Sequence, residues 1–189
     1  MANSNNPFGF RPIARLGGSP FSVSEYGKPA SDSTSAIFAF DLLMKSATAV
    51  AMPERPDLNL TGVANANEGT AGTTLWVGVS MNYGAVSTAT VHLVFDEVDI
   101  IYAVQGKTGV TYSTASHVGK NANVSFTTAG STTTKISGMA VDGATIATTA
   151  GLDMRLLKIS TVPPNMEGAN AIFEVTILKS IFAQGAAGL

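Results

Sequence analysis

The chain has 189 residues, no cysteine and two histidines; 13% of its residues are charged and 45% are hydrophobic. The lack of cysteine excludes disulfides and thiolate metal sites. Histidine is scarce and the charged residues are scattered, whereas catalysis near neutral pH usually recruits side chains with tunable proton affinities. The composition therefore argues against an enzyme, and it predicts a structural protein with no catalytic residue, cofactor or metal.

Charge also limits the partners that the sequence predicts. The net charge is −2 and lysine and arginine form no run, so neither nucleic acid nor a membrane surface is an expected partner. No apolar run approaches the length of a membrane span, and the first residues lack the pattern of a secretory signal. Soluble domains average about 25% charged residues. The 13% found here predicts a surface covered by partners or by copies of the chain.

Residues 1–35 are predicted to form an extended N-terminal arm. Pro7, Pro12, Pro20 and Pro29 exclude a helix or a central strand. Aromatic and aliphatic residues recur between them, and a solvated tail would gain nothing from such anchors. Twenty-five extended residues reach about 80 Å, far beyond a body with a radius of gyration of about 16 Å. The arm is therefore expected to lie on a neighbour, and folding back onto its own body as irregular edge structure stays open as the alternative.

Residues 36–182 are predicted to form a β-rich body, and residues 183–189 a flexible C-terminal tail. Short strands are expected at 37–44, 74–82, 90–95, 100–105, 132–142, 152–161 and 171–180. No segment longer than about ten residues has helical periodicity with caps. The pattern predicts an all-β fold, an antiparallel β-barrel or β-sandwich with an extended N-terminal arm, and a jelly-roll-like order stays open.

Two of these segments carry more specific expectations. Strands 90–95 and 100–105 flank Asp96-Glu97-Val98-Asp99, which predicts a hairpin with a polar connection. In the last strand, Phe173, Val175 and Ile177 share the face that is expected to be buried.

Four features of the sequence are candidate sites of chemistry. The carboxylates of residues 96–99 suit calcium, but the spacing is not that of an EF-hand, and a polar turn is the simpler interpretation. His92 lies within an apolar strand and is expected to be structural. Trp76 is expected in the core rather than as a platform for sugar. The threonine-rich residues 125–138 suit the solvent face of strands better than a carbohydrate site.

The segment Phe8-Gly9-Phe10-Arg11-Pro12 opens a series of blocks that resembles one family of virion proteins. The other blocks are HLVFDEVDIIYAVQ (92–105), VGKNANVSFTTAGSTTTKISGMAVD (118–142) and LDMRLLKISTVPPNMEGANAIFEVTIL (152–178). In order and spacing they resemble the head decoration proteins, or capsid cement proteins, of tailed bacteriophages. Residues 45–73 match this family only loosely.

The resemblance implies a β-rich structural protein on the exterior of the virion, made in the host cytoplasm during assembly. Its partners would be the major capsid protein and further copies of itself, as a homotrimer or homodimer. It would bind between capsid subunits and stabilise the shell. Another virion component (a head fibre, connector or tail protein) and a carbohydrate-binding module on the virion stay open as alternatives.

The predicted partner-binding residues are Phe8, Phe10, Arg11, Pro12 and Phe21. They cluster in a segment that is not expected to form regular structure. Phe8 and Phe10 would fill apolar pockets on a neighbour, and Arg11 would pair with a carboxylate or a backbone carbonyl there.

Overall fold

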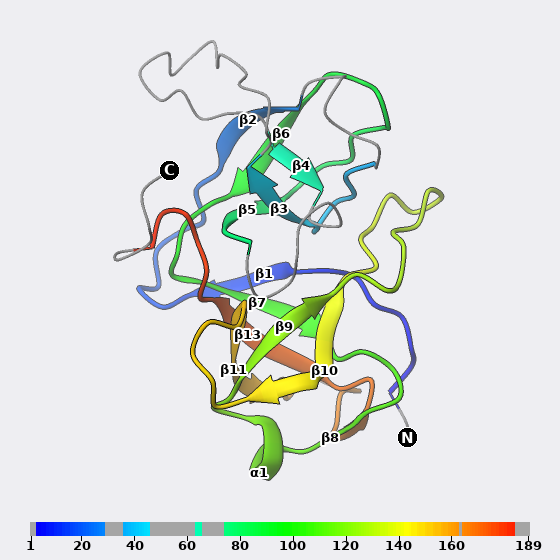
Figure 1. The fold of residues 1–189 in the computed structure, drawn as a ribbon, viewed down its shortest axis with the longest axis vertical. Coiled ribbons are helices and arrows are strands. Elements are labelled where there is room, and N and C mark those ends of the chain that lie inside the picture. Colours follow the sequence, from blue (N-terminus) through cyan, green and yellow to red (C-terminus); the bar gives the residue numbers. More distant parts are fainter. Residues whose placement is uncertain (1–2, 29–35, 46–62, 66–73, 163, 184–189) are drawn as a thin grey trace.

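The computed structural model describes residues 3–28, 36–45, 63–65, 74–162 and 164–183, which form an all-β fold (Figure 1). A six-stranded antiparallel sheet has the order β1 (Arg11–Arg15), β7 (Ile100–Gln105), β13 (Ile172–Ile177), β11 (Met154–Ile159), β9 (Asn121–Ser125) and β10 (Ala140–Ala147). A five-stranded sheet has the order β2 (Ser24–Lys28), β6 (Thr90–Phe95), β5 (Trp76–Ser80), β3 (Leu42–Lys45) and β4 (Val63–Asn65). The short strands β8 (Thr111–Tyr112) and β12 (Gly168–Ala169) pair with each other, and helix α1 (Thr114–His117) follows β8. The predicted antiparallel all-β class is confirmed.

The two sheets lie one above the other in Figure 1 and share a core. Trp76 on β5 is fully buried, as the sequence predicts. Its indole Nε1 donates a hydrogen bond to Asp153 Oδ1 at 3.2 Å, and the backbone N–H of Val124 on β9 donates to Asp153 Oδ2 at 3.0 Å. One buried carboxylate therefore joins the five-stranded sheet to the six-stranded sheet.

Strands β6 and β7 match the predicted residue ranges, but the predicted hairpin is wrong. β6 pairs with β2 and β5, whereas β7 pairs with β1 and β13. Residues 96–99 carry the chain from one sheet to the other. Both strands bury side chains in the interior, and each is paired on both of its sides by strands of its own sheet, which leaves no free edge for a hairpin between them.

The last two long strands follow the sequence expectation more closely. β11 and β13 pair with each other, from Met154 opposite Ile177 to Ile159 opposite Phe173. Phe173 and Val175 are buried and Ile177 is half-buried, as the alternation predicts. The predicted strand 132–142 is wrong in its first part, because β10 begins only at Ala140 and the threonine-rich residues before it form a loop.

The prediction of a separate N-terminal arm is wrong for residues 3–28. β1 pairs with β7 at one edge of the six-stranded sheet, and β2 pairs with β6 at one edge of the five-stranded sheet. This is the alternative in which the segment folds back onto its own body. Both strands are edge strands, and for β1 this suits Pro12, because an edge strand tolerates a missing N–H donor. Residues 29–35, and the predicted tail from residue 184 onward, lie outside the described residues.

Candidate partner-binding site

Phe10 is a core residue, so its predicted role as an anchor on a neighbour is wrong. Its ring is fully buried and packs edge-on against Tyr102, with centroids 6.2 Å apart. Its backbone N–H donates to the carbonyl of Phe40 at 2.9 Å. Gly9 allows the chain to place Phe10 in the core. Its φ is 71°, which favours glycine, and a Cβ there would collide with the Phe40 carbonyl oxygen and with Ser137.

Phe8 and Arg11 stay at the surface and contact each other. The guanidinium carbon of Arg11 lies 5.2 Å from the ring centroid of Phe8 and 5.4 Å from that of Phe40. Such cation–π contacts contribute about 0.5–1 kcal/mol each at exposed sites. Together these contacts restrict the conformations of the Arg11 side chain. Less side-chain entropy is then lost when the exposed guanidinium binds a partner.

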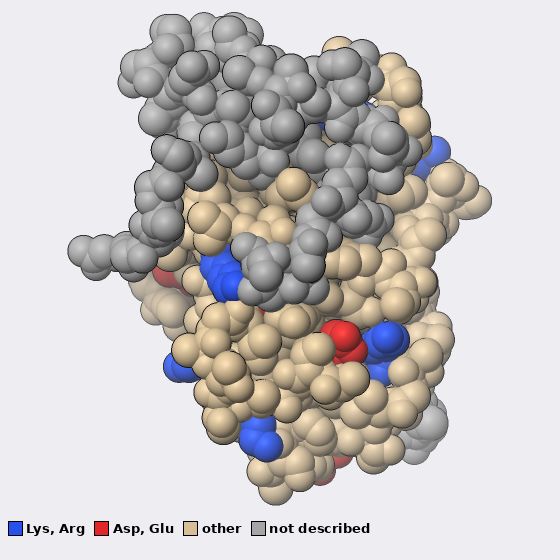
Figure 2. Space-filling model, in the orientation of Figure 1, with Lys and Arg blue, Asp and Glu red and all other residues tan. Residues whose placement is uncertain are grey.

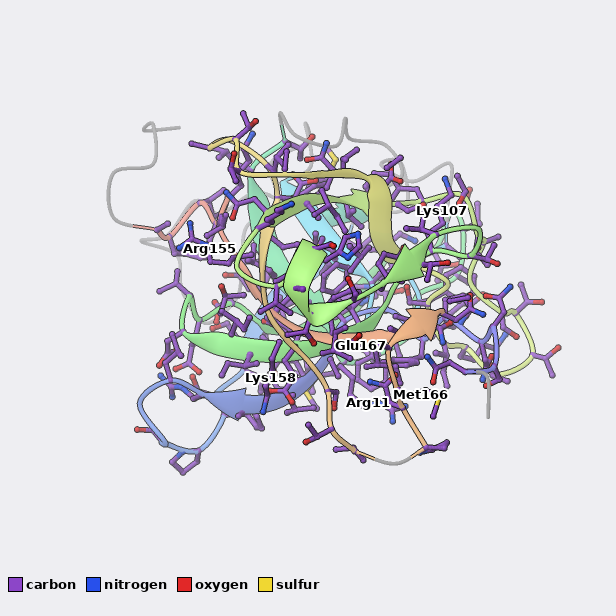
Figure 3. All side chains as sticks on the ribbon, turned by 90° about the horizontal axis from the view of Figure 1, so that it is seen from below. Arg11, Lys107, Arg155, Lys158, Met166 and Glu167 are labelled. Atoms are coloured by element: carbon purple, nitrogen blue, oxygen red, sulfur yellow. The ribbon has the colours of Figure 1, made fainter. Side chains whose placement is uncertain are left out.

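Two hollows meet at this Phe8–Arg11 pair, and both residues line each of them. The first hollow has a volume of about 600 Å³ and lies over the six-stranded sheet, between the first residues of the chain and the loop after β11. The second has a volume of about 450 Å³ and lies between residues 6–8 and the threonine-rich loop before β10. Figure 3 shows Arg11 and Lys158 toward the same side of the molecule, with Lys107 and Arg155 away from them.

The wall of the first hollow is built by hydrogen bonds that sequence reasoning missed. Gln105 Nε2 donates to the carbonyl of Ser4 at 2.9 Å, and Gln105 Oε1 accepts from the N–H of Asn6 at 3.0 Å. Asn3 Nδ2 donates to the carbonyl of Met166 at 2.7 Å. These long-range bonds hold residues 3–6 against the end of the sheet. No local sequence signal marks them, because the partners are about 100 or more residues apart.

The remaining predicted residues divide between two places. Pro12 is half-buried in β1, beside Arg11. Phe21 is 42% exposed and packs edge-on against Phe95, with centroids 5.8 Å apart, but it lines neither hollow. The structure therefore brings Phe8 and Arg11 together, whereas Pro12 lies opposite the buried Tyr102 and lines neither hollow, and Phe21 lies near the connection between the sheets.

The acidic residues 96–99 bind the N-terminal segment. Arg15 forms ion pairs with Glu97 and Asp99, each at 3.0 Å, and the hydroxyl of Tyr26 donates to Asp96 Oδ2 at 2.8 Å. Each carboxylate thus contacts a partner from the same chain, which agrees with a polar turn. Among the described residues, no group of three histidine, aspartate or glutamate side chains is placed to hold a metal ion.

The contact between Arg15 and Asp99 is expected to stabilise the fold measurably. Arg15 donates from both Nε and Nη2 to the Asp99 carboxylate, and both side chains are partly buried. A double-mutant cycle with Arg15→Ala and Asp99→Ala should give a coupling energy of about 1 kcal/mol, the upper end for surface pairs. Urea unfolding at low and high salt measures this coupling energy, and salt should weaken it.

The matched control for Arg15–Asp99 is the pair Lys158–Glu174, whose lysine is more than half exposed and which should have a smaller coupling energy. Equal coupling energies for the two pairs would contradict the prediction.

The two histidines are held separately by their own hydrogen bonds. His92 is fully buried, and its Nδ1 lies 2.9 Å from Ser80 Oγ. His117 in α1 bonds to the backbone of Ser113. His92 is therefore structural, as the sequence predicts.

One face of the molecule, the one with β9 and β10 in front, carries few charges. Figure 2 shows lysine, arginine, aspartate and glutamate scattered over the visible face without gathering into a patch. No helix in the described part of the chain has the length and apolar character that crossing a membrane requires. Comparisons of the chain with protein-family models, with curated proteins and with solved structures find no match.

Proposed function

We propose that this chain is a structural protein of a bacteriophage virion, a decoration protein that binds the outer surface of the head between major capsid subunits. The observation that carries the proposal is the surface at Phe8 and Arg11, where an aromatic ring and an exposed cation stand between two hollows. These are the residue types that dominate the binding energy of protein interfaces. They belong to the same segment that carries the resemblance to decoration proteins.

The composition of the surface supports the same function. Interfaces that are dry at their centre are depleted in lysine and glutamate, and this chain has only 13% charged residues. Two neighbouring hollows offer two contacts at once. Linked contacts raise the effective affinity by orders of magnitude without any single strong contact.

Sedimentation with phage heads tests the proposal. Heads of the phage that encodes this chain, prepared without it, should pellet the purified full chain at a copy number comparable with that of the major capsid subunits. Depleted heads should also lose their contents at a lower temperature than decorated heads. Binding of only a few copies would instead indicate a connector or tail component, and no binding would refute the proposal. Light scattering of the free chain tests the expected homodimer or homotrimer.

Reversing the charge of Arg11 is expected to weaken head binding without affecting the fold. Arg11 is exposed, and no described aspartate or glutamate forms an ion pair with it. Arg11→Glu should therefore reduce the affinity for heads at least about tenfold, as loss of an interface anchor does. Arg155→Glu is the matched control, since Arg155 is also exposed in a strand of the same sheet but lines neither hollow. Equal losses in both variants would indicate a general charge effect and contradict the assignment to Arg11.

A further inference from the structure

A row of side chains crosses four strands of the sheet, and three of its members, Arg11, Ala103 and Glu174, line the larger hollow. Arg11 on β1 pairs with Ala103 on β7, Ala103 pairs with Glu174 on β13, and Glu174 pairs with Lys158 on β11. Residues opposite each other on adjacent strands point to the same face of a sheet. Ala103 has the smallest side chain of the four, so the surface of the sheet is depressed between Arg11 and Glu174. The hollow of about 600 Å³ lies over this low point.

The charges along the row leave one cation without an internal partner. Lys158 Nζ lies 3.1 Å from Glu174 Oε1, so the carboxylate of Glu174 is already paired. Arg11 forms no ion pair with any described residue, and its contacts with Phe8 and Phe40 are with aromatic rings. The hollow therefore offers a fixed positive charge at one side and a neutralised pair at the other. An occupant with a carboxylate complements it.

The other walls of the hollow are mostly apolar. Ile13 is 42% exposed and Val162 is 69% exposed, and Phe8, Ala14, Pro164 and Ile172 are further apolar residues of the lining. Burying such surface yields about 25 cal/mol per Å². The complementary occupant thus combines an apolar side chain with the carboxylate.

The edge of the sheet is a poor place for this occupant. β1 is the edge strand, but Pro12 has no N–H to donate, and the pairing register shifts between Pro12 and Ala14. Proline and irregular register are devices that block the addition of a further strand. A bound segment must therefore lie across the face of the sheet, over Ala103.

We propose that the hollow over Ala103 binds an extended segment of the capsid protein, with an apolar side chain over Ala103 and an aspartate or glutamate on Arg11. This rests on the proposed function and names the chemistry of the partner at that site. The selectivity comes from Arg11, because a basic segment would meet a cation that forms no ion pair with any described residue, and would lose affinity. The binding is salt-dependent, since the guanidinium is exposed to solvent.

The test uses the full chain and heads prepared without it. Ala103→Met fills the hollow from its floor, and Ala144→Met makes the same change at an exposed position of β10 at the other edge of the same sheet. Ala103→Met should bind heads at least about tenfold more weakly than the wild type, whereas Ala144→Met should bind normally. Both variants should keep the circular dichroism spectrum and the urea midpoint of the wild type. If wild-type chain binds heads and Ala103→Met binds equally well, the proposed function stands and this inference is overturned.

Cross-linking identifies the occupant directly and covers the case in which Ala103→Met misfolds. A photoreactive amino acid at Val162, on the rim of the hollow, should link to a capsid-protein peptide that contains an aspartate or glutamate beside apolar residues. A link to a second copy of this chain, to a basic capsid segment, or to no protein on decorated heads would each overturn the inference. Failure of the wild-type chain to bind heads would instead refute the proposed function itself.

Discussion

Replacing Phe10 with alanine is expected to lower the free energy of unfolding by about 3–5 kcal/mol, as for other buried phenylalanines. The ring is fully buried against Tyr102 inside the core that the two sheets share. Its removal leaves a cavity that the surrounding strands fill only in part. Urea unfolding of the purified chain, followed by tryptophan fluorescence, measures the loss, because Trp76 belongs to the same core.

Phe8→Ala is the matched control, since it removes the same side chain two residues away. Phe8 is half-buried and its ring contacts Arg11, so its loss should cost only about 1 kcal/mol. The two variants should rank the other way in head binding. Among molecules that stay folded, Phe8→Ala should bind heads more weakly than the wild type and more weakly than Phe10→Ala. If Phe10→Ala changed stability by less than about 0.5 kcal/mol, the value typical of surface substitutions, Phe10 would not be a core residue.

The sequence could predict the features that depend on neighbouring residues. Alternation along residues 171–180 identified the buried Phe173 and Val175, and the apolar surroundings of Trp76 placed it in the core. The prolines limited the first 28 residues to edge positions, which is where β1 and β2 lie. These inferences succeed because each rests on a local property of the chain, such as alternation or a missing donor.

The features that depend on distant pairing were out of reach. Two adjacent strands with a short polar connection resemble a hairpin, and only the partners β1, β2 and β13 reveal that β6 and β7 belong to different sheets. The aromatic residues of the first segment predict anchors for a neighbour, but Phe10 lies in the core of its own chain. Composition alone does not separate these two roles, since both require a buried aromatic ring.

The candidate site divides in the same way. The sequence singled out Phe8 and Arg11, which the structure brings together. It missed Gln105, Ala103 and Glu174, because the row from Arg11 to Lys158 exists only through the register of four strands. Ala103 lies between Arg11 and Glu174 only across paired strands, so the sequence alone does not mark it as part of a site.

Acid should destabilise the protein through His92. The imidazole is fully buried, its Nδ1 bonds to Ser80, and its Nε2 has no hydrogen-bond partner among the described residues. Burial, aided by the nearby charge of Lys28, lowers the pKa of His92 from 6.5 to about 4. The ring also packs against Gly84, where a Cβ would collide with Nε2.

The sign of the effect follows from which state binds the proton. Between pH 6.5 and about 4, the unfolded chain protonates His92 and the folded protein does not, so stability is lost as the pH falls through this window. The lowering of the His92 pKa from 6.5 to about 4 corresponds, at roughly 1.4 kcal/mol per pH unit, to a loss of about 3 kcal/mol in the free energy of unfolding. Urea unfolding of the wild type and of His92→Gln at pH 7.5 and pH 4 should show that the wild type loses about 3 kcal/mol more than the variant.

The carboxylates titrate in both proteins, so their contribution cancels in this comparison. If His92→Gln fails to fold, an NMR titration of the wild-type imidazole provides the same test, because the ring should stay neutral at pH 5.5. Equal acid losses in the two proteins, or an imidazole that titrates near 6.5, would show that His92 is not held neutral by its burial.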